Sequence, residues 1–181
     1  MPETIIVVPC YNEARRLPVE TFQTFVNRVR NIRFLFVDDG SADATAEVLE
    51  TLQASDTEAF DIHTLAGNSG KSEAVRQGFL KSFESNPNYV GFWDADLATP
   101  LDAISEFCDL LDSRPDIEMV FGARVQLLGR AIRRNMVRHY LGRLFATAAS
   151  FLLGINVYDT QCGAKLFRLT PDLIALFQEP F

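Results

Sequence analysis

At 181 residues the chain fits one domain with a single core, and a hydrophobic content of 48% with 23% charged residues is ordinary for a globular protein. Its formal net charge of −7 argues against a nucleic-acid binder. Three cysteines at irregular spacing favour a reducing compartment and indicate neither a disulfide framework nor a zinc site. No basic leader precedes the first apolar segment, and no apolar stretch reaches the ~20 residues of a spanning helix, so we expect a cytoplasmic location.

Apolar segments with strand character alternate with amphipathic helical segments. Strands are expected at residues 4–9, 34–37, 60–65, 89–93 and 119–122. Helices are expected to begin near residues 18, 43, 70 and 100. This alternation predicts an α/β fold, a doubly wound sheet whose strands are mostly parallel. Ligands of such sheets bind beyond the carboxyl ends of the strands, which is where this order places Asp38, Asp39, Asp94, Asp96 and Arg124.

Two carboxylates one residue apart, Asp94 and Asp96, follow the fourth expected strand. If the strand continued through them, they would share a face and repel, and a bound divalent cation is the usual remedy. A solvated turn is the alternative, and the tripeptide alone does not separate the two. Asp38 and Asp39 make a second acidic corner, and paired acidic corners suit a nucleoside diphosphate with a divalent cation.

The segment 67–72, Gly-Asn-Ser-Gly-Lys-Ser, is not a Walker phosphate-binding loop. That loop requires a glycine five residues before the Gly-Lys-Ser, and Leu65 holds the position. We expect instead a turn and a helix N-terminus near a nucleotide, with Lys71 approaching a phosphate.

Charge is distributed unevenly along the chain. Residues 119–158 contain no aspartate or glutamate and six arginines, namely Arg124, Arg130, Arg133, Arg134, Arg138 and Arg143. Such a stretch favours a local anionic partner, either phosphate or a membrane surface. Residues 131–155 are predicted to form one long amphipathic helix or two in tandem. The helix either lies in the interface of an anionic membrane or packs on the sheet with solvated arginines.

Six motifs occur in one order along the chain. They are residues 7–13 (VVPCYNE), 37–45 (VDDGSADAT), 70–78 (GKSEAVRQG), 94–96 (DAD), 122–124 (GAR) and 159–163 (DTQCG). The order resembles the family 2 glycosyltransferases of GT-A fold, in particular the branch that transfers glucose or mannose to dolichyl or polyprenyl phosphate. The resemblance implies a single GT-A catalytic domain over residues 1–181, in which residues 1–125 bind the nucleotide sugar and residues 126–181 face acceptor and membrane. It also implies relatives that continue further, so we expect the chain to be truncated at its C-terminus.

The resemblance also implies roles for individual residues. Pro9, Tyr11 and Glu13 would hold the nucleoside with the acidic pair Asp38 and Asp39, and Asp39 would read the base. Lys71 would serve the same nucleotide site.

The remaining implied roles concern the cation and the acceptor. Asp96, with Asp94, would bind Mg²⁺ or Mn²⁺, and Asp94 would also face the sugar nucleotide. Arg124, Arg134 and Arg138 would grip the lipid phosphate, and Asp159 with Gln161 would lie on the acceptor side as orienting groups.

The implied activity is the inverting, metal-dependent transfer of a hexose to a polyprenyl phosphate at the cytoplasmic face of a membrane. UDP-glucose is favoured as donor over GDP-mannose because Ala98-Thr99-Pro100 is similar to the glucosyltransferase branch. Ala98 stands where many mannosyltransferases have glutamine, and Ala164 where an aromatic residue is common. The alternatives are a family 2 enzyme with a saccharide acceptor and a non-catalytic nucleotide-sugar-binding domain.

Overall fold

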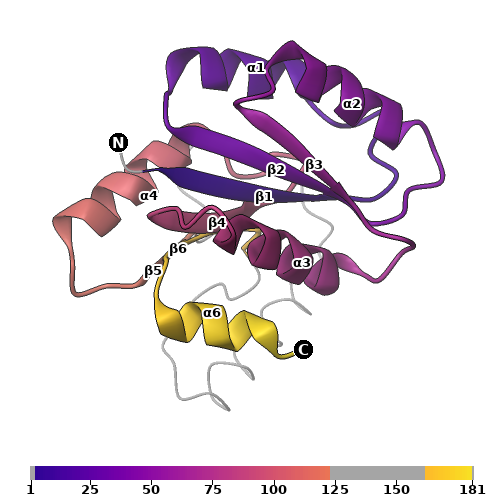
Figure 1. The fold of residues 1–181 in the computed structure, drawn as a ribbon. Helices are drawn as coiled ribbons and strands as arrows, with labels where there is room; N and C mark the ends of the chain where they lie inside the picture. The colour runs from indigo at the N-terminus through magenta and orange to yellow at the C-terminus, as the bar shows by residue number, and fades with distance from the viewer. Residues whose placement is uncertain (1–2, 123–161, 181) are drawn as a thin grey trace, which may run out of the picture. The chain divides into compact units, whose positions relative to one another are not determined.

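A computed structural model of the chain describes residues 3–122 and 162–180 (Figure 1). The chain divides into two units, residues 1–120 with 163–181 and residues 121–162. The described helices and strands belong to the first unit, apart from Phe121 at its boundary. The predicted arginine-rich helix at residues 131–155 lies outside the described residues.

Six strands form one sheet, in the order β3-β2-β1-β4-β6-β5. In chain order the strands are β1 (Thr4–Cys10), β2 (Ile32–Asp38), β3 (Phe60–Thr64), β4 (Tyr89–Trp93), β5 (Met119–Phe121) and β6 (Ala164–Arg168). The described helices are α1 (Val19–Arg28), α2 (Thr45–Ser55), α3 (Lys71–Phe83), α4 (Asp102–Ser113) and α6 (Pro171–Gln178). Strands β1 to β4 pair in parallel, and β6 is antiparallel to β4. The prediction of an α/β fold with a mostly parallel sheet is therefore confirmed.

The apolar side chains of β2 alternate between the two faces of the sheet. Phe34 and Phe36 point to the side of α1, where the ring of Phe22 lies 5.1 Å from each of theirs, centroid to centroid. Leu35 and Val37 belong to the apolar cluster that includes α3. Because both faces are covered, the strand is an uninterrupted apolar run, as expected of a central parallel strand.

The side chains of strand β4 also alternate between the two faces of the sheet. Val90 packs in the cluster with α3 and α6, whereas Trp93 contacts Phe107 of α4 at 5.4 Å between ring centroids. Figure 1 shows α1 and α2 on one face of the sheet and α3 and α6 on the other. Helix α3 lies close against β1, because a Cβ placed on Gly78 would be 2.4 Å from Val7 Cγ1. The sheet is thus doubly wound.

Two local features differ from the expectation. The helix expected to begin near residue 43 with Asp43 as its cap is α2, whose N-cap is Ala44, although the Asp43 carboxylate does accept a hydrogen bond from the N–H of Thr45. Strand β6 was not predicted at all, and it separates β4 from the fifth expected strand, β5, which lies at the sheet edge. Within the described ranges, no helix combines the length and apolarity that crossing a membrane demands.

Candidate active site

The carboxyl ends of β1, β2 and β4 lie at one edge of the sheet. Cys10 at the end of β1 is in register with Asp38 at the end of β2, and β4 runs parallel beside β1. The loops that follow these strands therefore meet, as predicted. Pro9 and Asp38 are near or at the ends of β1 and β2 themselves. The loops carry Tyr11 and Glu13 after β1, Asp39 after β2, and Asp94 and Asp96 after β4.

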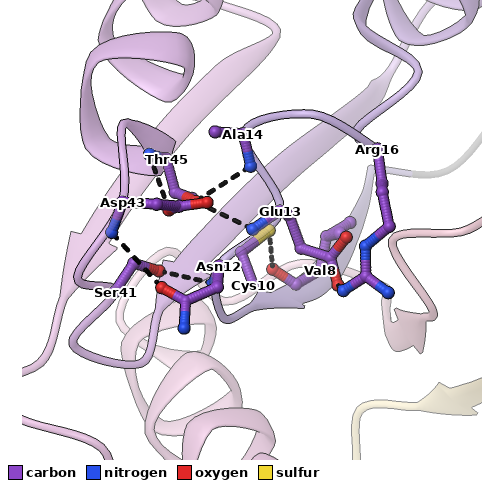
Figure 2. A network of polar contacts seen from close by, with 9 residues as sticks. All are labelled: Val8, Cys10, Asn12, Glu13, Ala14, Arg16, Ser41, Asp43 and Thr45. Carbon is purple, nitrogen blue, oxygen red and sulfur yellow. Dashed lines mark hydrogen bonds and ion pairs between the residues drawn. The ribbon is translucent and has the colours of Figure 1, made fainter.

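A network of polar contacts joins the first loop to the second (Figure 2). Asn12, whose φ of 54° is left-handed, accepts hydrogen bonds at Oδ1 from the N–H groups of Ala42 and Asp43, at 2.9 and 3.3 Å. Its own N–H donates to Ser41 Oγ at 3.0 Å. Asparagine tolerates this backbone conformation better than most residues, so Asn12 suits both the turn and the contacts.

Thr45, at the start of α2, holds the other end of the first loop. Its buried Oγ1 accepts hydrogen bonds from the N–H groups of Glu13 and Ala14 at 2.8 and 3.1 Å, and donates to Asp43 Oδ1 (Figure 2). The hydrogen bond from Thr45 is the main reason that the pKa of Asp43 is lowered. The Glu13 carboxylate pairs with Arg16 at 2.8 Å. Contacts within the chain hold this loop, and Tyr11 on it is 45% exposed.

Asp38, the last residue of β2, and Asp39, which follows it, are buried, and their carboxylates accept hydrogen bonds from the neighbouring loops. Asp38 accepts hydrogen bonds from Ser41 through both the N–H and the hydroxyl. Asp39, 3% exposed, accepts the N–H of Ser69 at one oxygen and the N–H of Gly70 at the other, at 2.7 and 2.9 Å. Asp39 therefore clamps the loop before α3, and any contact with a base uses its remaining lone pairs.

Gly40 is required where the second loop meets the loop before α3. Its φ is +66°, and a Cβ there would lie 2.6 Å from the Cα of Gly67 and 2.7 Å from the N of Asn68. Any side chain would be strained and would also push the two backbones apart. Gly40 and Asp39 together fix the position from which Lys71 projects.

The Asp-x-Asp sequence lies in a turn, because β4 ends at Trp93. Strand alternation therefore stops before both carboxylates and does not explain their orientation. Asp94 forms an ion pair with Lys71, and Asp96 Oδ1 accepts the N–H of Ala98 at 3.0 Å. Leu97 has a φ of +50°, which is strained for a branched side chain. The segment can be a turn and still bind a cation, because the carboxylates of Asp94 and Asp96 both keep lone pairs that these contacts do not use.

Gly163 packs directly on Asp94. Its carbonyl oxygen accepts the N–H of Asp94 at 2.8 Å, and a Cβ on Gly163 would lie 1.8 Å from Asp94 Oδ2. Only glycine leaves room for the carboxylate in this position. The sequence motif contained this glycine, but nothing in the motif showed which side chain requires it.

Asp94 and Asp96 fit a divalent cation that is shared with a ligand. Asp96 is exposed and the side chain of Asp94 is 30% exposed, so a ligand can reach both carboxylates from solvent. In the part of the chain that the structure describes, no group of three or more metal-ligating side chains occurs. Mg²⁺ and similar ions bind through one or two carboxylates when substrate phosphates complete the coordination. These two carboxylates therefore suit a cation that is also bound by a nucleotide better than a cation that is held by the protein alone.

The acceptor-side predictions fall elsewhere in the chain. Arg124, Arg134, Arg138, Asp159 and Gln161 all lie outside the described residues.

Cys10, beneath the first loop, is buried, and burial together with Glu13 and Asp38 raises the pKa of its thiol. The thiol is therefore neutral and is no candidate nucleophile.

The sequence matches the model of glycosyl transferase family 2 over residues 5–172. The chain belongs to glycosyltransferase family 2. The family predicted from the six motifs is therefore confirmed.

The dolichyl-phosphate beta-glucosyltransferase of Saccharomyces cerevisiae is 34% identical over 90% of this chain and 54% of its own length. The mouse protein of the same name is 33% identical over 89% of this chain and 53% of its own. The polyprenol monophosphomannose synthase of Mycolicibacterium smegmatis is 26% identical over 91% of this chain and 61% of its own. The chain thus spans about half the length of its glucosyltransferase relatives.

Solved structures agree with the fold. The mannosyltransferase PcManGT from Pyrobaculum calidifontis, in complex with GDP-Man and Mn²⁺, matches with a TM-score of 0.61 at 17% identity, over 92% of this chain and 44% of that one. Glucosyl-3-phosphoglycerate synthase from Mycobacterium tuberculosis with UDP matches with a TM-score of 0.61 at 19% identity, over 92% and 57%. The fold is accordingly that of GT-A glycosyltransferases.

Proposed function

We propose that this chain transfers a hexose from a nucleoside diphosphate sugar to a polyprenyl phosphate. The observation that carries the proposal is the meeting of three fixed loops at one sheet edge, with the Asp-x-Asp turn beside Lys71. UDP-glucose is favoured over GDP-mannose, because the yeast and mouse glucosyltransferases are 34% and 33% identical to this chain and the mannose synthase 26%.

The first two loops form the nucleoside site. Pro9, Tyr11 and Glu13 line it from β1, and Asp38 and Asp39 support it from β2. The exposed ring of Tyr11 offers a surface on which a base can stack. The buried carboxylate of Asp39 contributes chiefly by holding the loop that presents Lys71 to the phosphates.

Asp96, with Asp94, would hold Mg²⁺ or Mn²⁺ against the diphosphate. When bound, the cation would act as a Lewis acid that stabilises the departing nucleoside diphosphate. Lys71, now paired with Asp94, adds a positive charge at the same place. Ala98 contributes no side-chain oxygen, so the affinity for the cation depends on the nucleotide.

The acceptor phosphate is already ionised at neutral pH, so it needs little help from a general base. One of its oxygens bonds to the anomeric carbon as the bond from that carbon to the diphosphate oxygen breaks. This single displacement inverts the anomeric centre. The main obstacle is bringing two anions together, and Arg124 and Arg138 would offset it by charge-assisted hydrogen bonds. Asp159 would orient the acceptor, and the arginine-rich segment would bring the chain to the cytoplasmic surface of a membrane as a peripheral protein.

A transfer assay tests the proposal. Wild-type protein is incubated with labelled UDP-glucose or GDP-mannose, Mn²⁺, and either a polyprenyl phosphate, the neutral polyprenol or a saccharide. Lipid-linked sugar formed only with the phosphate supports the proposal. Transfer to the saccharide alone shows a different acceptor class, and nucleotide binding without any transfer shows a non-catalytic binding domain.

A further inference from the structure

Lys71 contacts one of the two carboxylates that would bind the cation. Its ammonium group forms an ion pair with Oδ1 of Asp94, and the side chains of the two residues are 56% and 30% exposed. The other oxygen, Oδ2, is the atom closest to the position that a Cβ on Gly163 would take. One oxygen of Asp94 therefore faces the backbone of Gly163, and the other already has a positive charge beside it.

The contact made by Asp96 is of a different kind. Asp96 Oδ1 accepts the backbone N–H of Ala98 at 3.0 Å. This donor is neutral, so it adds no repulsion to a divalent cation on Asp96. At Asp94 the cation would meet the ammonium group of Lys71, and two positive charges on one carboxylate oxygen repel each other strongly. Lys71 and the cation therefore exclude each other at Oδ1 of Asp94.

The backbone before Lys71 is held in place, whereas its side chain is free to turn. The carboxylate of Asp39 accepts the N–H groups of Ser69 and Gly70 at 2.7 and 2.9 Å, and Lys71 begins α3. The exposed side chain has a flexible four-carbon stem, so the ammonium group can leave Asp94 without a change in the fold. The dipole of α3 also favours an anion near this end of the helix. A donor phosphate there would give the ammonium group a new partner.

We propose that Lys71 competes with the divalent cation for Asp94, and that binding of the cation moves the ammonium group of Lys71 from Asp94 to a phosphate of the donor. The inference rests on the proposed function, because that function supplies the cation and the phosphate. Lys71 is then a positioning residue for the cation as well as a contact for the nucleotide. Binding of the cation and binding of the nucleotide are linked through this one side chain.

The test measures binding of Mn²⁺ alone by electron paramagnetic resonance, and binding of UDP at saturating Mn²⁺ by calorimetry. Lys71→Met removes the charge, Lys71→Arg keeps it, and Asp94→Asn removes the carboxylate for which Lys71 and the cation compete. The double variant Lys71→Met/Asp94→Asn completes a double-mutant cycle. Lys81→Met is the matched control, because Lys81 lies on the same helix and pairs with Glu84 at 2.7 Å.

Lys71→Met should bind Mn²⁺ alone about fivefold more tightly than the wild type, because the cation no longer has to displace an ion pair. The same variant should bind UDP about tenfold more weakly at saturating Mn²⁺, because the contact with a phosphate is lost. The two effects thus have opposite signs. Lys71→Arg should bind Mn²⁺ as the wild type does, and Lys81→Met should change neither quantity. In the Asp94→Asn background, Lys71→Met should have little effect on Mn²⁺ binding.

The competition is disproved if Lys71→Met binds Mn²⁺ alone no more tightly than the wild type. An equally large gain in the Asp94→Asn background would also disprove it, since the effect would then be one of general charge. Weaker binding of both Mn²⁺ and UDP would show that Lys71 only orients Asp94, and unchanged UDP binding would show that Lys71 does not move to a phosphate. The proposed function fails separately if the wild type binds no nucleotide and transfers no sugar, because the measurement with Mn²⁺ alone requires neither.

Discussion

Gly163 shows how a residue without a side chain sets the position of a carboxylate. A Cβ at this position would lie 1.8 Å from Oδ2 of Asp94 and 2.1 Å from its Cγ. The backbone at residue 163 also accepts the N–H of Asp94. The orientation of Asp94 is therefore fixed by the residue that precedes β6 as much as by β4.

Gly163→Ala should displace the Asp94 carboxylate and weaken the Mn²⁺-dependent binding of UDP about tenfold. Calorimetry with and without Mn²⁺ measures the effect. Gly67→Ala is the matched control, because a Cβ on Gly67 meets no atom within 4 Å. Equal behaviour of the two variants would show that Asp94 tolerates a shift and that its present position is not functional.

At the scale of elements, the loops of the site are fixed by contacts between segments far apart in sequence. Thr45 on α2 holds the backbone of the loop after β1, and Asp39 after β2 holds the loop before α3. Each contact joins a side chain to backbone N–H groups about 30 residues away. Such clamps keep a binding site in shape before the ligand arrives, which lowers the entropy cost of binding.

Thr45→Val removes the acceptor for the N–H groups of Glu13 and Ala14, so it should lower the free energy of unfolding by about 1–3 kcal/mol. Urea denaturation at pH 7 measures the change. Thr51→Val on the same helix is the control, because the exposed Thr51 hydroxyl only donates to Glu47 O at 2.8 Å. A loss as small as that of the control would show that the first loop does not depend on Thr45.

Thr45→Val should also change how the stability depends on pH, because Thr45 donates a hydrogen bond to Asp43. The hydrogen bond from Thr45 lowers the pKa of Asp43, so it stabilises the fold above the ordinary pKa of ~3.9 and is lost as pH falls through the lowered value. The difference in the free energy of unfolding between wild type and Thr45→Val should therefore become smaller in acid. A carboxyl resonance of Asp43 that titrates alike in both proteins would contradict the assignment.

The sheet and the edge at which the candidate site lies could be predicted from the sequence, because continuous apolar runs followed by aspartates mark central parallel strands. Strand β6 could not, since its sequence, Ala-Lys-Leu-Phe-Arg, is short and its partner β4 lies more than 70 residues earlier. The clamp by Asp39 and the contact of Gly163 with Asp94 depend on that tertiary arrangement.

At the scale of the whole molecule, the proposed chemistry requires two anionic substrates to meet in an acidic protein. The formal net charge is −7, yet residues 119–158 carry six arginines and no acidic residue. Attraction of the lipid phosphate is thus assigned to that segment, and binding of the donor to the sheet edge described here. The two functions should respond separately to mutation.

Arg138→Ala should raise the KM for polyprenyl phosphate about tenfold and leave UDP binding unchanged, because it removes one charge-assisted contact with the acceptor. Transfer kinetics at a fixed concentration of UDP-glucose measure the first quantity and calorimetry the second. Arg114→Ala is the control, since the exposed Arg114 pairs with Asp116 at 2.7 Å on the surface. Equal losses for donor and acceptor would place Arg138 in the wrong site.

The central claim is that the sheet edge binds a nucleoside diphosphate together with a divalent cation held by the Asp-x-Asp turn. The most direct measurement is calorimetric titration of UDP and GDP, with and without Mn²⁺, into wild type and Asp96→Asn. Asparagine keeps an oxygen that can accept the N–H of Ala98, so the turn is preserved while the charge is lost. We predict that the wild type binds UDP more tightly than GDP, that Mn²⁺ strengthens binding, and that Asp96→Asn abolishes this gain. An undiminished effect of Mn²⁺ on Asp96→Asn, or no binding of either nucleotide by the wild type, would contradict the claim.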